Sequence, residues 1–138
     1  MGPKVVKPVY LLDSVILIDH LRGIEPATKW LSKLREGQAV LSVITRAEVL
    51  SGGTDDEQAA AFELCGQFEC LPLTESDATK AARLRRESGW RLPDAFQAAS
   101  AVRNGLKLVT RDARAFDPKA HAFVLIPYSL CALAVRTD

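Results

Sequence analysis

Short apolar runs alternate with longer amphipathic stretches along this chain of 138 residues. The runs are rich in Val, Leu and Ile, which is typical of buried strands. Strands are predicted at residues 9–12, 39–44, 70–73, 106–109 and 123–126. The stretches between them carry apolar residues at helical spacing and end in glycine or proline signals. Helices are predicted over residues 14–22, 26–35, 55–68, 74–88 and 93–104, and from Thr45 to the Gly52-Gly53 pair.

This alternation of strands with helices predicts an α/β fold with a mostly parallel sheet that helices cover on both faces. No internal repeat, low-complexity segment or linker divides the chain. We therefore predict a single domain across residues 1–138, with an N-terminal tail at 1–8. Residues 127–138 form a C-terminal tail that the pattern does not assign to any element.

The composition is that of an ordinary globular protein, with 48% hydrophobic and 25% charged residues. The formal net charge is +1, so any basic surface that could attract nucleic acid must be local. Cys65, Cys70 and Cys131 form no C-x-x-C pair, which indicates reduced thiols and no zinc site. The first residues show no apolar core of a secretion signal, and Pro127 interrupts an apolar stretch too short to cross a membrane. We expect a cytoplasmic protein.

Acidic residues stand where predicted strands end or predicted helices begin. The set comprises Asp13, Glu48, Asp94 and Asp112. Each has a structural explanation when taken alone. Asp13 can cap a helix, Thr45-x-x-Glu48 matches a capping box, and acids in a first turn are favoured by the helix dipole.

Taken together, the four acids point to chemistry. The carboxyl ends of parallel strands face one edge of a sheet, and ligand sites form there. Carboxylates that converge at such an edge repel one another unless a cation lies between them. Mg²⁺ and Mn²⁺ take oxygen ligands from carboxylates, and they can hold substrate phosphates and make a water molecule nucleophilic. The pattern therefore suggests a Mg²⁺ or Mn²⁺ site.

Motifs in the same order resemble those of the PIN-domain ribonucleases, and most closely those of the VapC toxins of bacterial and archaeal toxin–antitoxin pairs. The matching segments are YLLDSVILIDHLRG, SVITRAEVLSG, LPL with LRRESGWRLPDAFQAASA, and LVTRDARAF. The resemblance implies a PIN-like three-layer α/β/α sandwich with a short, mostly parallel central sheet. It implies a Mg²⁺-dependent endoribonuclease that cuts single-stranded or loop RNA. It also implies a homodimeric toxin that a small VapB-like antitoxin neutralises.

The same resemblance assigns roles to individual residues. The metal ligands and catalytic acids are Asp13, Glu48, Asp94 and Asp112. Asp112 matches a fourth acidic position, but Asp117 lies close by and could share its role. Ser14 and Thr110 match small hydroxyl residues that support the site. Asp19 is kept apart from the four acids and is assigned a helix-surface or hydrogen-bonding role.

Positive charge is concentrated between Lys80 and Lys119, where ten basic residues outnumber four acidic ones. Such a local field favours phosphate binding, although the run from Lys80 to Arg86 can equally be a solvated helix face. The candidate contacts to RNA phosphates are Arg46, Arg91, Arg111 and Arg114. Trp90 is the one candidate for stacking on a base, whereas Trp30 is assigned to the core.

Two other functions stay open at this point. A PIN fold that binds RNA or a partner with weak or no catalysis is the first, and the intact set of acids argues against it. A phosphotransfer domain with an aspartyl nucleophile at Asp13 is the second. That chemistry calls for a D-x-D motif, and Val15 stands where its second aspartate belongs, so only the fold class supports it.

Overall fold

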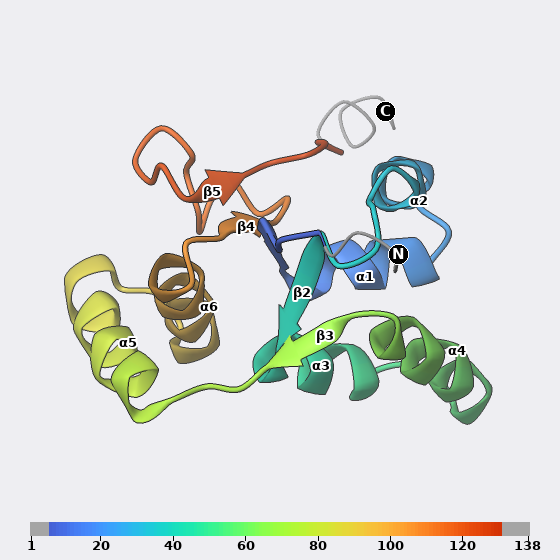
Figure 1. Cartoon of the computed structure of the whole chain (residues 1–138), viewed down its shortest axis with the longest axis horizontal. Coiled ribbons are helices and arrows are strands. Elements are labelled where there is room, and N and C mark those ends of the chain that lie inside the picture. Colours follow the sequence, from blue (N-terminus) through green and yellow to red (C-terminus); the bar gives the residue numbers. More distant parts are fainter. Residues whose placement is uncertain (1–5, 131–138) are drawn as a thin grey trace, which may run out of the picture.

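The short strands of the protein form a single sheet, so their carboxyl ends lie along one edge. The structure, a computed structural model, describes residues 6–130. Its strands are β1 (Tyr10–Leu12), β2 (Ala39–Ser42), β3 (Glu69–Leu71), β4 (Lys107–Val109) and β5 (Val124–Leu125). The strand pairs of this sheet are all parallel, and the order across it is β3-β2-β1-β4-β5 (Figure 1). The chain thus builds outward from β1 in one direction and later returns to build outward in the other.

The helices lie close to their predicted positions. They are α1 (Ser14–Leu21), α2 (Glu25–Ser32), α3 (Val43–Leu50), α4 (Asp55–Gly66), α5 (Glu75–Ser88) and α6 (Leu92–Arg103). Helices α5 and α6 lie on one side of the sheet and α1 to α4 on the other (Figure 1). No helix among residues 6–130 is both long enough and apolar enough to cross a membrane.

Alternating strand residues divide the core into two halves. Successive side chains of a strand point to opposite faces of a sheet. Leu11 and Leu108 accordingly pack against α5 and α6, whereas their neighbours Leu12 and Val109 pack against α1, α3 and α4. Both faces of the sheet are therefore buried, which is why the strands are nearly continuous apolar runs. The predicted three-layer α/β/α sandwich is confirmed, and the mostly parallel sheet is wholly parallel over the described residues.

The start of α3 differs from the prediction. β2 ends at Ser42, whose hydroxyl accepts hydrogen bonds from the backbone N–H groups of Ile44 and Thr45 and so caps the helix. The capping box that Thr45-x-x-Glu48 suggested is therefore wrong, because Thr45 already lies inside the helix. Its hydroxyl instead donates to the carbonyl of Leu12 at 2.7 Å. Glu48 is left without a capping role and faces the edge of the sheet.

An ion pair between a buried carboxylate and a partly exposed arginine joins α5 to α6. Asp77 completes the predicted capping box with Thr74 and also accepts two hydrogen bonds from Arg103, at 2.7 and 3.1 Å. Burial alone would raise the pKa of Asp77. The hydrogen bonds from Arg103 and Thr74 and the charge of Arg103 outweigh burial, so the pKa of Asp77 lies below its ordinary value. This pair fixes the helix that carries Asp94.

The two tryptophans have packing roles. Trp30 meets the ring of Tyr10 edge-on, with 5.3 Å between centroids, and packs against the α1–α4 half of the core as predicted. Trp90 is only 8% exposed, and its Nε1 donates to the carbonyl of Ala115 at 2.7 Å. Its ring packs against the rings of Phe116 and His121, so little of its surface is left for the predicted stacking on a base. Cys131, residues 1–5 and the predicted tail beyond residue 130 lie outside the described residues.

Candidate active site

An open cleft lies beyond the carboxyl ends of β1 and β4, where the order of the strands reverses. Such crevices are the usual ligand sites of parallel sheets. The cleft has a volume of about 920 Å³, and the four predicted acids all line it. They are Asp13 after β1, Glu48 on α3, Asp94 in the first turn of α6 and Asp112 in the loop after β4. Residues from four separate parts of the chain thus meet at one place.

Asp13 is the most buried of these acids, with 8% of its surface exposed. It caps α1 by accepting from the backbone N–H of Ser14 at 2.9 Å, as predicted. Its other oxygen accepts from the hydroxyl of Thr110 at 2.8 Å. Burial raises the pKa of Asp13, the charge of Asp94 adds to that, and the donors Thr110, Gln97 and Ser14 only partly oppose it. A carboxylate in this setting is stabilised by a nearby cation.

The other acids form a half-buried to exposed group around the mouth of the cleft. Burial raises the pKa of Asp94, and so do the charges of Glu48 and Asp112, while Arg91 opposes the rise. Glu48 accepts a hydrogen bond from the hydroxyl of Ser14 at 2.8 Å, which orients its side chain. The charges of Glu48 and Asp112 thus both act on Asp94 across the cleft.

The structure separates Asp112 from Asp117. The backbone N–H of Asp112 donates to the Thr110 hydroxyl at 3.1 Å, and its carboxylate accepts from the N–H of Ala115 at 3.2 Å. These bonds close a turn that holds Asp112 at the cleft. Asp117 is exposed, caps a later turn by accepting from the N–H of Lys119, and is not among the residues that line the cleft. Of the two, Asp112 is the one that lines the cleft with the other three acids.

The donor set of the cleft suits a hard divalent cation. Its ligands would be carboxylate oxygens, which Mg²⁺ and Mn²⁺ prefer. Burial is the main cause of the raised pKa values of Asp13 and Asp94, and the charges of neighbouring carboxylates add to it. No group of three or more His, Cys, Asp or Glu side chains within residues 6–130 stands arranged to hold an ion. Asp112 is exposed and Glu48 is half-exposed. To move toward Asp13 and Asp94, they would have to give up the hydrogen bonds that they accept from the Ala115 N–H and the Ser14 hydroxyl, respectively. The chemistry of the residues therefore fits, and their arrangement would have to tighten.

A polar network that the sequence did not reveal lies beneath Asp13. Gln97 of α6 is buried in a stretch of alanines, and the Ser42 hydroxyl donates to its Oε1 at 2.6 Å. The hydroxyl of Thr45 already donates to the Leu12 carbonyl, so it accepts from Gln97 Nε2 at 2.7 Å. These two hydroxyls fix the orientation of the amide and direct Nε2 toward Asp13, 3.4 Å away. The one available signal was a glutamine in a helix whose other buried residues are small, mostly alanines.

The predicted phosphate contacts separate into two groups. Arg91, Arg111 and Arg114 line the cleft. Arg46 does not, because its guanidinium lies over the ring of Phe62 on α4, 4.9 Å from the centroid. Arg91 is 75% exposed at its side chain, and its Nε lies 3.9 Å from a carboxylate oxygen of Asp94. Arg91 and Arg114 are therefore the predicted arginines that present their charge to the mouth of the cleft.

Arg111 has a partner that the sequence did not predict. Asp19 accepts from Arg111 Nε at 2.5 Å and from its Nη2 at 3.1 Å, and also from the hydroxyl of Tyr128 at 2.8 Å. Of the two roles assigned to Asp19, the hydrogen-bonding one is confirmed, and the helix-surface one is wrong because Asp19 is buried. An RNA phosphate would therefore have to share Arg111 with a buried carboxylate.

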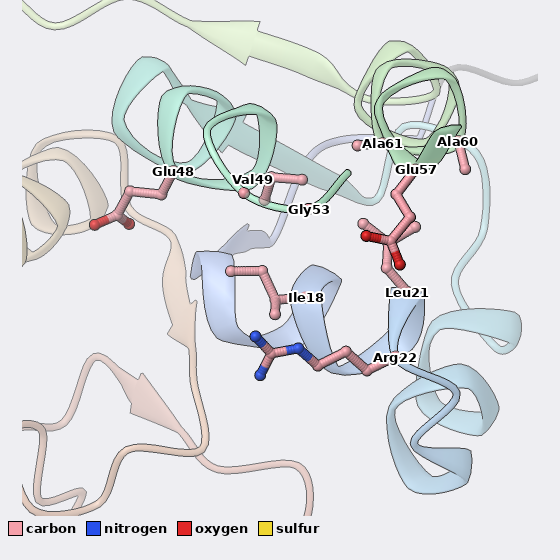
Figure 2. A pocket seen from close by; sticks show the side chains of 10 residues that line it. Ile18, Leu21, Arg22, Glu48, Val49, Gly53, Glu57, Ala60 and Ala61 are labelled. Carbon is pink, nitrogen blue, oxygen red and sulfur yellow. The ribbon is translucent and has the colours of Figure 1, made fainter. Parts of the chain in front are cut away.

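A second, smaller pocket borders the acidic cleft. It has a volume of about 220 Å³ and lies between α1, α3 and α4 (Figure 2). Ile18, Leu21 and Val49 make it apolar, and Arg22 and Glu57 add charge at its walls. Glu48 borders both spaces, and Figure 2 shows its carboxylate directed away from the small pocket. The carboxylate thus belongs to the acidic cleft.

The chain is similar to known proteins over most of its length. Residues 10–121 match the PIN domain family. Ribonuclease VapC10 of Mycobacterium tuberculosis is 37% identical over 77 residues, which is 55% of this chain and 58% of that protein. The match thus spans little more than half the length of this curated relative.

Solved structures extend the similarity over most of the chain. A toxin–antitoxin complex from Klebsiella pneumoniae has 29% identity and a TM-score of 0.77, and the match covers 87% of this chain and 98% of that one. The structure of FitAcB from Neisseria gonorrhoeae has 26% identity and a TM-score of 0.70, with 86% and 98% covered. With the family match running from β1 to the segment just before β5, this chain belongs to the PIN domain family.

Proposed function

We propose that this protein is a metal-dependent endoribonuclease of the VapC type and the toxin of a toxin–antitoxin pair. The observation that carries the proposal is the convergence of Asp13, Glu48, Asp94 and Asp112 on one cleft. Four acids from separate elements have no shared structural role, and a bound cation relieves the repulsion between carboxylates that converge on one place. The similarity to a ribonuclease of Mycobacterium tuberculosis supports RNA as the substrate.

In this proposal the chain's own residues hold and orient the reacting groups. Asp13 and Asp94 would be the principal ligands of Mg²⁺, or of Mn²⁺ in its place, with Glu48 and Asp112 completing the set. When bound, the cation would offset the negative charge of a phosphodiester and make a water molecule nucleophilic. Thr110 and the backbone of Ser14 hold Asp13 in one orientation, and the Ser14 hydroxyl does the same for Glu48.

Metal dependence of RNA cleavage is the direct test. The purified protein is expected to cut an unstructured RNA oligonucleotide in Mg²⁺ or Mn²⁺, leaving 5′-phosphate and 3′-hydroxyl ends. EDTA should stop the reaction and excess metal restore it, because the carboxylates alone supply no positive charge to the phosphate. Gel analysis of end-labelled RNA measures both the rate and the ends. Cleavage that continues unchanged in EDTA would contradict the proposal.

A second candidate function is an RNA-binding or partner-docking PIN domain with weak or no catalysis. The observation that favours it is the lack, within the described residues, of three acids already arranged around one point. Calorimetry separates the two candidates. Uptake of Mn²⁺ or Mg²⁺ supports the nuclease, whereas RNA binding without metal uptake near millimolar concentration supports the docking module.

The phosphate contacts of the proposal are Arg91 and Arg114. In EDTA, where no cleavage occurs, replacing both by Gln is expected to weaken RNA binding and to make it less dependent on salt. The slope of log Kd against log salt should fall by about 0.7 for each lost contact to single-stranded RNA. Fluorescence anisotropy of a labelled oligonucleotide over a series of salt concentrations measures this.

A matched control is available on α5. Arg83 and Arg86 are exposed there and border none of the acidic cleft, so their replacement by Gln removes the same charge elsewhere. The slope should stay near that of the wild type. Equal changes in both double variants would mean that RNA binding depends on total charge and not on the cleft.

The partners belong to the same proposal. The similarity to a toxin–antitoxin complex over 87% of this chain supports a small VapB-like antitoxin as a binding partner. We propose that the toxin acts in the cytoplasm as a homodimer and that the antitoxin covers the acidic cleft. The open form of that cleft leaves its acids accessible to such a partner.

A further inference from the structure

Arg111 stands at the boundary between the acidic cleft and a buried carboxylate. Arg111 is among the residues that line the cleft, yet its guanidinium is hydrogen-bonded to Asp19, which does not line it. Asp112, its neighbour in the chain, also attracts it electrostatically. The hydrogen bonds with Asp19, more than any other factor, raise the pKa of Arg111. The guanidinium is thus hydrogen-bonded to Asp19 and attracted by charge to Asp112, and the geometry favours Asp19.

Three parts of the chain meet at Asp19. It lies on α1, Arg111 lies in the loop after β4, and Tyr128 lies in the segment that runs from β5 back toward α1 and α2 (Figure 1). Burial and the hydrogen bond to Asp19 raise the pKa of Tyr128, so its hydroxyl stays protonated as a donor. Both oxygens of Asp19 therefore accept from donors that have fixed positions. A buried carboxylate held in this way forms a strong, charge-assisted ion pair with its arginine.

The neighbouring Arg91 shows what an arginine does here when no such partner restrains it. It is mostly exposed, and it leans toward Asp94 to 3.9 Å. A guanidinium has five donors and a fixed positive charge, so it competes with a metal ion for the same carboxylate oxygens. Arg111 lines the same cleft as the four acids. Without its partner Asp19, its guanidinium could turn toward them.

We infer that Asp19 and Tyr128 restrain Arg111 and so keep its guanidinium out of the cation site formed by the four acids. Asp19 is in this sense a positioning residue, which acts on the site through Arg111 and touches neither metal nor RNA. The inference rests on the proposed function, because it concerns the same acids. It explains why an acid that is not a ligand is buried beside the site.

Two single variants that break the same ion pair test the inference. Asp19→Asn removes the charge and presents an amide N–H to a guanidinium that has only donors, so Arg111 is released as a free cation. Arg111→Gln breaks the same pair but leaves no cation. Calorimetric titration with Mn²⁺, on protein shown to be folded by circular dichroism, is expected to give about tenfold weaker binding for Asp19→Asn. Arg111→Gln should bind Mn²⁺ within about twofold of the wild type.

Other outcomes are decisive too. Equal weakening in both variants would mean that the pair merely supports the fold, and unchanged binding in Asp19→Asn would mean that Arg111 does not compete. Either result overturns the inference. If Asp19→Asn does not fold, Tyr128→Phe replaces it, because that change removes one donor to the same carboxylate and leaves both charges. The inference is supported if Tyr128→Phe binds Mn²⁺ more weakly than the wild type and the double variant Tyr128→Phe/Arg111→Gln regains wild-type binding. It is overturned if Tyr128→Phe binds Mn²⁺ as tightly as the wild type.

Wild-type protein that takes up no Mn²⁺ would contradict the proposed function, and the inference is then decided without metal. Asp112→Asn relieves repulsion among the acids and should raise the Tm of the wild-type background. In the Asp19→Asn variant, where Arg111 is released, Asp112→Asn removes a carboxylate that the freed guanidinium can pair with. The Tm should therefore not rise there. A rise in both backgrounds overturns the inference.

Discussion

Replacing Asp13 by Asn is expected to lower the rate of metal-dependent RNA cleavage by about 10³-fold or more, while the protein stays folded. Asn has nearly the same shape and can still accept from the N–H of Ser14, so the cap of α1 survives. What is lost is the negative charge that burial has concentrated at the end of β1. Single-turnover cleavage with saturating Mg²⁺ measures the rate, and calorimetry measures the accompanying loss of Mn²⁺ affinity.

An exposed acid of another helix provides the control for this experiment. Asp55, in the first turn of α4, can be changed to Asn with the same loss of charge and without effect on cleavage. The same assay decides between the two candidates for the fourth acid. Asp112→Asn should slow cleavage because Asp112 lines the cleft, and Asp117→Asn should not. Full activity of purified Asp13→Asn protein would sink the assignment of the active site.

Replacing Gln97 by Leu is expected to lower the free energy of unfolding by about 2–3 kcal/mol, because it strips a buried network of its central member. The hydroxyl of Ser42 loses its acceptor, and that of Thr45 loses a donor, and both residues are buried away from solvent. Asp13 also loses a neutral donor. Cleavage should therefore slow by about tenfold in addition, since small displacements of reacting groups are costly. Urea denaturation and the cleavage assay measure the two effects.

Gln58 is a matched control for this substitution. It too donates from a side-chain amide, to the carbonyls of Leu50 and Gly52, but it is partly exposed. Water can satisfy those carbonyls, so Gln58→Leu should change the free energy of unfolding by no more than about 0.5 kcal/mol and leave cleavage intact. Similar losses of stability in both variants would mean that the network under Asp13 contributes no more to the free energy of unfolding than exposed hydrogen bonds do.

The elements of the fold were predictable because their signals are local. Apolar runs of four to six residues marked each strand, and caps such as Asp13 and Thr74 marked the helix starts. The start of α3 was missed for an equally local reason. Ser42 and Thr45 both belong to residue types that cap helices, and only the end of the pairing with β3 at Ser42 decides between them.

The sequence alone determined which acids lie at the strand ends. The tertiary structure decided which residues form hydrogen bonds and ion pairs around them. A strand end is recognisable from one stretch of chain, so Asp13, Glu48, Asp94 and Asp112 could be named as a group once the strands were expected to be parallel. The contacts that orient or shield them join residues far apart in sequence. Asp19 and Arg111 are 92 positions apart, Gln97 and Asp13 are 84, and Thr110 and Asp13 are 97. Such pairs cannot be recognised from the periodicity of the sequence. They depend on the strand order, which places β4 beside β1, and on the packing of α6 against these two strands.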